Sequence, residues 1–536
     1  MVDTTILWFF TIIYLAVTMY LGYLGYKRTK ASEDFMLAGR KIHPWIIGFS
    51  YGATFISTSA IVGFGGISAI YGMGLIWLAM LNIGVGVLLA FIVFGTRTRE
   101  LGVKLKALTF PHLLAKRFGS PFMQYATAFV ILVGMPLYAA AVLIGGAKFI
   151  EITLSVDYQV ALLGFAAITA VYVVFGGLRG VMYTDALQGA IMLVGMVILL
   201  ILTFSLLGGP TVAFNDLSSL SSEIPASMAS KGLVSWTAMP ELGSEYWLVL
   251  VTTIIMGVGI GVLAQPQLVV RFMTAKDNKA LNRAIPIGGL FILLTTGVVY
   301  TVGPLTNVYF FDKLGQISIA AAGGNADNII PLYINSAMPD LFVVIFMLVL
   351  LAAAMSTLSS IFHTLGTTAG FDLWGHIVRR RSGAKEIGEP SLKANKVGTM
   401  VMIVASVAFA FAMPDQIIAR ATAMFMGLCA CAFLPAFVHA LFSKRPSTFA
   451  AVVSVVLGGT SWFLWTGFVH VKESSILGLS QLLFGSPAVL GMPWQVVDPL
   501  VIALPLSIVG LLGGWAYERY VVESKVQSNG RSGASE

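Results

Sequence analysis

The stretch SYGATFISTSA, residues 50–60, lies inside a hydrophobic run that extends from about Pro44 to Met73. As one α-helix this run would measure ~45 Å, whereas the hydrocarbon core of a bilayer is only ~30 Å thick. The middle of the run is rich in hydroxyl side chains and contains Gly52 and β-branched Ile56, and this composition propagates a helix poorly. Non-helical backbone survives at membrane depth only where protein buries it or where it lines a wet cavity. The stretch therefore predicts either a broken helix whose carbonyl and hydroxyl groups face one point, or a continuous helix packed through its small residues.

The composition of the whole chain excludes an ordinary soluble protein. Of the 536 residues, 57% are hydrophobic and only 10% are charged, and apolar runs long enough to cross a bilayer recur throughout. We therefore expect an all-α polytopic membrane protein. The net charge of +8 does not indicate nucleic-acid binding, because the basic residues lie in short loops between the apolar runs.

Thirteen apolar runs predict thirteen transmembrane spans, at about 5–26, 44–73, 75–96, 121–148, 158–178, 181–208, 246–272, 284–310, 341–371, 394–413, 416–441, 448–470 and 497–518. Basic residues fill every second loop: 27–43, 97–120, 271–283 (counting Arg271), 379–396 and 444–445. The long loop 209–245 is instead acidic. This alternation predicts a multi-pass protein of the plasma membrane with its N-terminus outside and its C-terminus in the cytoplasm.

A second interruption is expected in the run 246–272, near its glycine-rich segment Gly257–Gly261, which Gln265-Pro266 follows. Clustered glycines and an internal proline are typical of an interrupted helix. This run lies five spans after the first broken run, so the two cross the membrane in opposite directions. Discontinuous helices at matching places of two inverted halves indicate a transporter with its binding site near the midplane.

These patterns divide the chain into six parts. They are an extra N-terminal helix with an inner loop (1–43), a first inverted repeat (44–208), an outer loop (209–245), a second inverted repeat (246–441), two peripheral C-terminal helices (442–520) and a disordered cytoplasmic tail (521–536). A short helix is expected near 328–334 within the outer loop 311–340.

A second concentration of hydroxyl groups occurs in LLAAAMSTLSS, residues 350–360. Ser356, Ser359 and Ser360 would share one helical face, and Thr357 lies a step around from it. Hydroxyl groups in membrane helices often bond only the carbonyl one turn back, or serve helix packing. Four of them within five positions, beside three alanines, favour a surface that coordinates a ligand.

A third motif, GGLRGVMYTDALQG at 176–189, places Asp185 in the first turns of a long apolar span. A carboxylate at that depth is costly and indicates function by default. Thr184 or Asp185 would also suit a cap at the inner end of helix 181–208. The residues themselves leave both interpretations open.

GGLRGVMYTDALQG, AQPQLVVRF (264–272) and LLAAAMSTLSS together resemble the sodium:solute symporter family, and the likeness extends from about residue 5 to 450. The resemblance implies a leucine-transporter-like inverted repeat of 5+5 helices with discontinuous first helices, plus an extra N-terminal helix. It also implies uptake by alternating access with Na⁺ as the coupling ion and no organic cofactor.

The same resemblance implies where sodium binds. The main site would consist of the backbone carbonyls of Ala53, Ile56 and Ala353 and the hydroxyls of Ser356 and Thr357. Family members with a second sodium hold it by an aspartate that matches Asp185 and by serines that match Ser356, Ser359 and Ser360.

In the solute region the chain departs from the proline-transporting branch of the family. That branch has an aspartate at the position of Phe55, and a tryptophan and a tyrosine at those of Val258 and Val262. The stretches SAIYGMGLIWLAM (68–80) and LIGGAKFIE (143–151) are more similar to the pantothenate-type branch. A small organic acid, such as a monocarboxylate or pantothenate, is therefore favoured over an amino acid such as proline. The residues expected near the solute are Ser57, Thr58, Tyr138, Val258 and Val262, although Tyr138 also fits an ordinary core position.

Three other functions compete with a sodium symporter. A sensor with a transporter-like fold would be expected to carry a kinase module, which the chain lacks. A proton-coupled carrier would need a central titratable group, for which Asp185 is the candidate. An intramembrane enzyme would rest on His363 near Ser359, without a partner carboxylate in sequence reach. We therefore expect no enzyme, and as partners a small organic solute and the bilayer but no nucleic acid; the sequence gives no oligomeric state.

Overall fold

The computed structural model describes all residues except 1–3, 376, 378–390, 414–416 and 523–536. In this part of the chain the elements are helices, and the only β-type pairing is an isolated bridge between Ile42 and Ala275. Eleven of the described helices are long and apolar enough to cross a membrane. The tail 521–536, expected to be disordered, lies almost entirely outside the described residues.

Eleven candidate helices accommodate thirteen expected spans, because two of the candidates each cover two of the spans. The longer one, α9 (Tyr158–Leu206), has 49 residues and would measure ~74 Å if straight, far more than one crossing needs. Gly177 interrupts it with non-helical angles of φ 58° and ψ −166°. The other candidate, 59–104, turns at Gly72, where φ is 76°. Both turns lie where the sequence separates two spans.

The first predicted interruption is present. Helix α3 (Pro44–Phe55) begins with a proline at its first position, where the missing N–H costs nothing. It ends at Ile56, whose angles of φ −89° and ψ 106° are those of extended chain. A π-helix, η2 (Ser59–Gly63), and helix α4 (Phe64–Tyr71) follow. Of the two interpretations of this stretch, the structure contains the broken helix.

The second interruption lies slightly later than the glycines suggest. The segment Gly257–Gly261 is itself helical (α13), between the π-helix η6 (Val249–Met256) and the 3₁₀ turn η7 (Val262–Ala264). The chain becomes extended at Gln265, and α14 (Pro266–Thr274) then begins. The expectation that the glycine run itself breaks the helix was wrong. These glycines permit close packing instead, since a Cβ at Gly259 would lie 2.2 Å from the Leu81 side chain.

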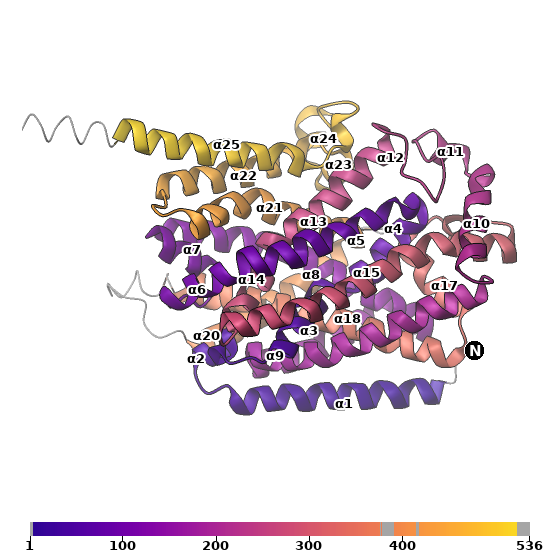
Figure 1. The fold of residues 1–536 in the computed structure, drawn as a ribbon, viewed down its shortest axis with the longest axis horizontal. Helices are drawn as coiled ribbons and strands as arrows, with labels where there is room; N and C mark the ends of the chain where they lie inside the picture. Colours follow the sequence, from indigo (N-terminus) through magenta and orange to yellow (C-terminus); the bar gives the residue numbers. More distant parts are fainter. Residues whose placement is uncertain (1–3, 376, 378–390, 414–416, 523–536) are drawn as a thin grey trace, which may run out of the picture.

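Figure 1 shows the arrangement of the bundle. Helix α1 (Thr4–Arg28) lies along one side against α9, and α22 (Thr448–Phe468) and α25 (Pro499–Tyr517) lie together on the opposite side. The most apolar windows of the span 340–374 and of α21 (Ile418–Phe442) are 83% buried, against 28% for α1 and α25. Together with α3 and with α8 (Pro121–Leu154), whose most apolar window is 72% buried, α18 (Asp340–Thr367) and α21 form the centre of the protein.

The remaining helices complete the bundle and its two ends. The α-helices are α2 (Ser32–Leu37), α5 (Ile76–Ile83), α6 (Thr96–Lys104), α7 (Phe110–Phe118), α8 (Pro121–Leu154), α10 (Pro210–Ser219), α11 (Ala226–Ala229), α12 (Glu245–Leu248), α15 (Asn278–Leu314), α16 (Ser318–Ala321), α17 (Ile329–Ala337), α18 (Asp340–Thr367), α20 (Leu392–Ala412), α23 (Val471–Leu477) and α24 (Leu479–Phe484). The π-helices are η4 (Gly84–Gly95), η9 (Thr368–Trp374) and η11 (Glu518–Val522). The short 3₁₀ turns are η1 (Ala38–Arg40), η3 (Gly72–Leu75), η5 (Leu220–Glu223), η8 (Ala326–Asn328) and η10 (Trp494–Val496). Helix α17 confirms the short helix expected near 328–334.

One end of the bundle carries residues 209–245, and we call it the outer end in accordance with the expected orientation. There α10 and α11 enclose a small apolar cluster around Trp236, which is fully buried. The Trp236 carbonyl accepts a hydrogen bond of 2.7 Å from the Met73 backbone N–H. This contact ties the outer loop to the turn that follows the first broken helix.

The other end, the inner end, is held closed by arginines that donate to backbone carbonyls. Arg40 donates to Ala107 O at 2.7 Å, Arg99 to Ala275 O at 2.9 Å, and Arg179 to Ala38 O at 2.6 Å. The bonds of Arg40 and Arg179 join the segment before α3 to the residues after α6 and to the interruption of α9, and the bond of Arg99 joins α6 to the end of α14.

Candidate functional site

The end of α3 and the middle of α18 meet in a cluster of neutral oxygen atoms. Ser356 Oγ lies 2.8 Å from Ala53 O and 3.1 Å from Ala353 O. Thr357 Oγ1 lies 3.3 Å from Ala53 O and 3.1 Å from Thr54 O. Because α3 stops at Phe55, the carbonyls of its last turn have no helical N–H partner and remain available. Four of the five residues expected at the main sodium site are thus brought together.

The fifth expected residue, Ile56, lies at the helix end, where its extended backbone leaves the helical ladder. In the described part of the chain no hydrogen bond joins Ile56 to Ser356 or Thr357. Carbonyls at a helix interruption and hydroxyls from a neighbouring helix are the donor set by which transporters bind Na⁺. The arrangement suits a small hard cation without any carboxylate.

Asp185 lies one layer further towards the inner end and is fully buried. Its Oδ2 accepts from Ser50 Oγ at 2.8 Å and from Thr54 Oγ1 at 3.3 Å, and its Oδ1 accepts from Ser359 Oγ at 3.3 Å. Ser360 Oγ is joined to Thr54 Oγ1 at 2.8 Å. The residues expected at a second sodium site are therefore part of one hydrogen-bond network.

The alternative interpretation, in which Thr184 or Asp185 caps a helix, does not describe this geometry. The helical part of α9 resumes directly after Gly177, several residues before Asp185. Thr184 Oγ1 donates back to the carbonyls of Gly180 and Val181. The Asp185 carboxylate accepts from side chains of three other helices and not from the first N–H groups of its own helix.

Arg271 is the residue at this site that the sequence analysis assigned wrongly. It was counted with the inner basic loop 271–283, but it belongs to α14 and its side chain is 1% exposed. Its Nη2 lies 2.8 Å from Asp185 Oδ2, its Nε donates to Ser50 Oγ at 3.0 Å, and it also contacts Ser360. The sequence did contain a signal for this contact. A buried carboxylate needs a cation nearby, and Arg271 lies near the end of the motif AQPQLVVRF.

The residues expected near the solute are all buried. Thr58 Oγ1 donates to Val142 O at 3.0 Å, so its hydroxyl is already satisfied. Tyr138 stacks on Phe425 with ring centroids 5.8 Å apart, and its hydroxyl, which faces Ser57, has no assigned hydrogen bond in the described structure. Buried hydroxyls are nearly always bonded, which makes this atom a candidate contact for a polar solute group.

Val258 and Val262 belong to the second interrupted helix, with Val262 packed beside Gly86 of η4. Near them the structure shows two polar residues that the sequence analysis did not single out. Gln267 Nε2 donates to Gln265 Oε1, while Gln265 Nε2 and Gln267 Oε1 lack a hydrogen bond to any described residue. Glutamines in an apolar run were the signal that could have revealed them.

Two further buried polar residues lie outside this cluster. Asp372 Oδ1, in η9, accepts from Thr109 Oγ1 at 2.8 Å and from Gln124 Nε2 at 2.7 Å. His363 Nε2 lies 2.8 Å from Phe35 O, a packing contact between α18 and α2. This contact gives His363 a structural role instead of the catalytic one considered above.

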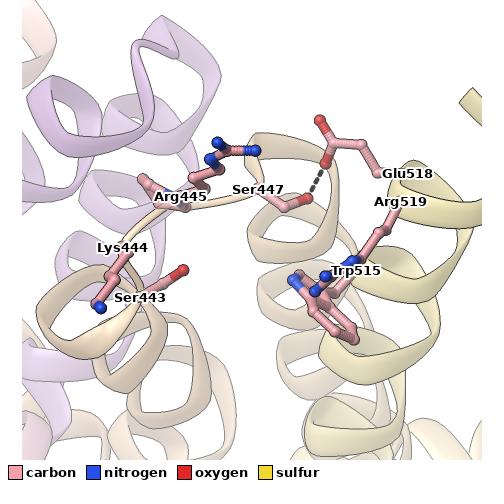
Figure 2. Close-up of a pocket in the computed structure, with 8 residues that line it drawn as sticks. Ser443, Lys444, Arg445, Ser447, Trp515, Glu518 and Arg519 are labelled. Atoms are coloured by element: carbon pink, nitrogen blue, oxygen red, sulfur yellow. Dashed lines mark hydrogen bonds between the residues drawn. The ribbon is translucent and has the colours of Figure 1, made fainter. Parts of the chain in front are cut away.

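An open hollow lies away from this site. It has a volume of about 440 Å³ and lies at the inner end, between the turn joining α21 to α22 and the end of α25 (Figure 2). Lys444, Arg445, Trp515 and Arg519 line it, and the side chains of Ser447 and Glu518 are hydrogen-bonded across it (Figure 2). None of the residues expected to bind sodium or solute is among them.

Residues 35–458 match the model of the Sodium:solute symporter family. The chain is 26% identical to the sodium/pantothenate symporter of Haemophilus influenzae over 488 residues, covering 89% of this chain and 95% of that protein. It is also 26% identical to the osmoregulated proline transporter OpuE of Bacillus subtilis over 473 residues, covering 87% and 89%.

Among solved structures, the substrate-bound outward-open state of a Na⁺-coupled sialic acid symporter superposes with a TM-score of 0.71. The superposition covers 94% of this chain and 96% of that one, at 19% sequence identity. The two proteins therefore have the same fold.

Proposed function

The chain belongs to the sodium:solute symporter family, and from this premise we propose that it is a secondary active symporter of the plasma membrane. It uses the Na⁺ gradient to import a small organic solute by alternating access. An organic acid such as a monocarboxylate or pantothenate is the favoured solute, and an amino acid such as proline is the second choice.

The observation that carries this proposal is the meeting of α18 with the broken end of α3. Ser356 and Thr357 direct their hydroxyls at the Ala53 carbonyl instead of bonding only within their own helix. When Na⁺ binds among these atoms, each hydroxyl can turn its proton away and offer a lone pair, because a hydroxyl both donates and accepts. The ion then links the two helices, which makes its binding sensitive to their relative position.

A second sodium is proposed at Asp185, with Ser359 and Ser360. The carboxylate already contacts the Arg271 guanidinium, and both groups are buried. A sodium ion and Arg271 would therefore compete for Asp185 Oδ2, so the ion binds there only when the guanidinium has moved away. This competition would couple the second sodium to a movement of α14.

The solute is proposed to bind between the two helix interruptions and α8, beside Ser57, Thr58, Tyr138, Val258 and Val262. The Tyr138 hydroxyl supports this position, since it is buried without an assigned hydrogen bond. Phe55, Val258 and Val262 leave an apolar surface where the proline branch has polar or aromatic groups. An acid with a hydrocarbon body suits that surface better than proline.

A proton-coupled carrier is the second candidate, because Asp372 is a buried carboxylate that accepts hydrogen bonds from the neutral side chains of Thr109 and Gln124. The two candidates are separated by uptake into proteoliposomes of labelled lactate, propionate, pantothenate and proline. An inward Na⁺ gradient and an inward proton gradient are imposed separately. Uptake that follows only the proton gradient, and persists without sodium, would contradict the proposal.

The sodium site itself is tested with Thr357→Ala. We expect the half-saturating Na⁺ concentration to rise about tenfold, the effect of losing about 1.4 kcal/mol of binding free energy, with little change in protein abundance. Thr367→Ala is the matched control, because the Thr367 hydroxyl bonds only carbonyls of its own helix. Unchanged sodium dependence in Thr357→Ala would remove this residue from the site.

A further inference from the structure

Three basic side chains surround the hollow at the inner end. Lys444 and Arg445 lie on the turn between α21 and α22, and Arg519 lies in η11, directly after α25. All three are exposed, and none of them is in an ion pair with another described residue. Basic residues are common at the inner ends of spans. Here they also enclose a volume of about 440 Å³, which lies within the range of ~300–1,000 Å³ typical of small-molecule sites.

One carboxylate, that of Glu518, also lines the hollow, so the charge there is mixed but net positive. Glu518 Oε2 accepts a hydrogen bond from Ser447 Oγ (Figure 2). The backbone N–H of Ser447 in turn donates to His439 Nε2 at 2.9 Å. Glu518 is therefore held in the wall between α22 and α25, and three cations against this single carboxylate leave an excess of positive charge for an anion.

An aromatic ring orients one of the three cations. Arg519 Cζ lies 5.1 Å from the centroid of the Trp515 ring. Figure 2 shows these two side chains together on one side of the hollow, across from Lys444 and Arg445. A cation–π contact of this kind restrains the guanidinium without using its N–H groups as hydrogen-bond donors. The fork of donors therefore remains available, and this fork fits the oxygens of a phosphate group.

The hollow lies where two peripheral helices reach the membrane surface. The most apolar windows of α22 and of the span 499–520 are only 33% and 28% buried, so both helices face lipid. Helix α22 has 21 residues and measures ~32 Å, close to the ~30 Å of the hydrocarbon core. Its first turn, beside the hollow, is therefore at the level of the lipid headgroups. Tyr517 and Tyr520 are 51% and 69% exposed next to it, as is typical of aromatic residues at that level.

We propose that this hollow binds the phosphate group of an anionic phospholipid of the inner leaflet, with phosphatidylglycerol as the representative of that class. Arg445 and Arg519 approach the phosphate oxygens from opposite walls, and Lys444 adds a point charge. Basic pockets between helices at the cytoplasmic side of a membrane suit such headgroups. The position beside lipid-facing helices favours a lipid over a soluble phosphate. The bound lipid would link the turn between α21 and α22 to the end of α25, whichever solute the protein transports.

The test is a titration of the purified full-length protein, in an uncharged detergent, with phosphatidylglycerol, in which native mass spectrometry counts the bound lipid. We expect the triple variant Lys444→Gln/Arg445→Gln/Arg519→Gln to bind this lipid about tenfold more weakly than the wild type. The matched control changes three exposed lysines of the inner end that do not line the hollow to glutamine, at Lys104, Lys116 and Lys279. It should bind like the wild type. Wild-type affinity in the triple variant, or an equal loss in the control, would overturn the site.

Glu518→Gln should change the affinity in the opposite direction, which damage to the fold would not do. The substitution removes the negative charge from the wall but keeps an oxygen that can accept from Ser447. We expect the dissociation constant for phosphatidylglycerol to fall about threefold, in line with the strength of an exposed charge pair. An unchanged or higher dissociation constant would contradict binding by the charge of the hollow.

Two other ligands identify the source of the phosphate. Phosphatidylcholine carries a phosphate group without a net charge, so it should bind more weakly than phosphatidylglycerol, and equal affinities would contradict an anion site. Inorganic phosphate at ~10 mM should raise the melting temperature less than phosphatidylglycerol does, by mass action on the folded state. If inorganic phosphate alone gives the full stabilisation and the lipid adds nothing, the hollow takes a soluble phosphate and the assignment to a lipid is wrong.

Discussion

At the residue scale, Asp185 and Arg271 form an ion pair in which both side chains are almost completely buried. Removing one member of such a pair leaves an uncompensated buried charge, which costs about 3–5 kcal/mol. We expect Asp185→Asn and Arg271→Gln each to lower thermal stability, and the double variant to recover much of the loss. Unfolding of the four proteins at one fixed Na⁺ concentration gives the coupling energy as a double-mutant cycle.

The same double variant decides whether Asp185 also holds a sodium ion. Since it lacks both the carboxylate and the competing guanidinium, it should transport with one sodium fewer per solute and a lower Hill slope. Ser50→Ala is a suitable control, because it removes a neutral contact of both side chains and keeps the ion pair. A wild-type ratio and Hill slope in the double variant would leave Asp185 only as the counter-ion of Arg271.

The sequence indicated one half of this pair and not the other. Asp185 and the hydroxyls of 356–360 stand out because polar groups are rare in apolar runs. Arg271 stands at the end of an apolar run. At such a position the local sequence is the same whether the arginine side chain reaches the surface or turns into the bundle. The packing of α14 against α3 and α18 sets the direction of the Arg271 side chain. It brings the guanidinium to Asp185, which is 86 residues away in the sequence.

At the scale of the element, the two interruptions arise from different chemistry. The first has no proline, and its helix ends at β-branched Ile56 among hydroxyl residues. The second is set by Pro266, which begins a new helix after the extended Gln265. Sequence predicted both interruptions but misplaced the second, because glycine suits a close helix contact as well as a helix break.

The packing role of these glycines leads to a prediction about Gly259. A side chain there would meet Leu81 of α5 at 2.2 Å from its first carbon, so Gly259→Leu should push α13 away from α5 and displace the second interruption. We expect solute uptake to fall at least tenfold while the protein still inserts into the membrane. Initial uptake rates per inserted molecule, quantified by surface biotinylation, are the measurement.

Gly257→Ala is the control for this effect, because the nearest atom to its new carbon is 3.8 Å away, at the Ala423 carbonyl. Normal uptake by Gly259→Leu would mean that α13 tolerates displacement and that its position does not define the site. Loss of uptake in both variants would instead point to the helical propensity of the segment.

At the scale of the whole molecule, the periodic features were the ones that sequence could predict. The described residues contain eleven candidate spans, and two of these, with turns at Gly72 and Gly177, each cover two of the expected spans. Local apolar content decides where helices form. It does not decide which helices touch, so the central position of α18 and α21 became visible only in the folded structure.

The closure of the inner end is also a property of the whole molecule, since it joins segments from both halves of the chain. Arg40→Gln should weaken it by removing the donor to Ala107 O, so that the inner end opens more often. Faster alkylation of Ala275→Cys in the Arg40→Gln background than in the wild-type background would report this opening. Lys104→Gln, which removes an exposed inner charge, is the control, and equal alkylation rates in all three proteins would contradict a gating role for Arg40.

The three arginine contacts at this end have main-chain atoms as acceptors, at Ala38, Ala107 and Ala275. Every amino acid has a backbone carbonyl, so a substitution at an acceptor position keeps the acceptor atom. Nearly any substitution of the arginine at a donor position removes the guanidinium and with it the hydrogen bond. In a genetic selection for mutants that leak solute, hits at the inner end should therefore concentrate in the codons of Arg40, Arg99 and Arg179. The acceptor positions are buried alanines, so among changes there only exchanges for other small residues should leave both the bond and the packing around it intact.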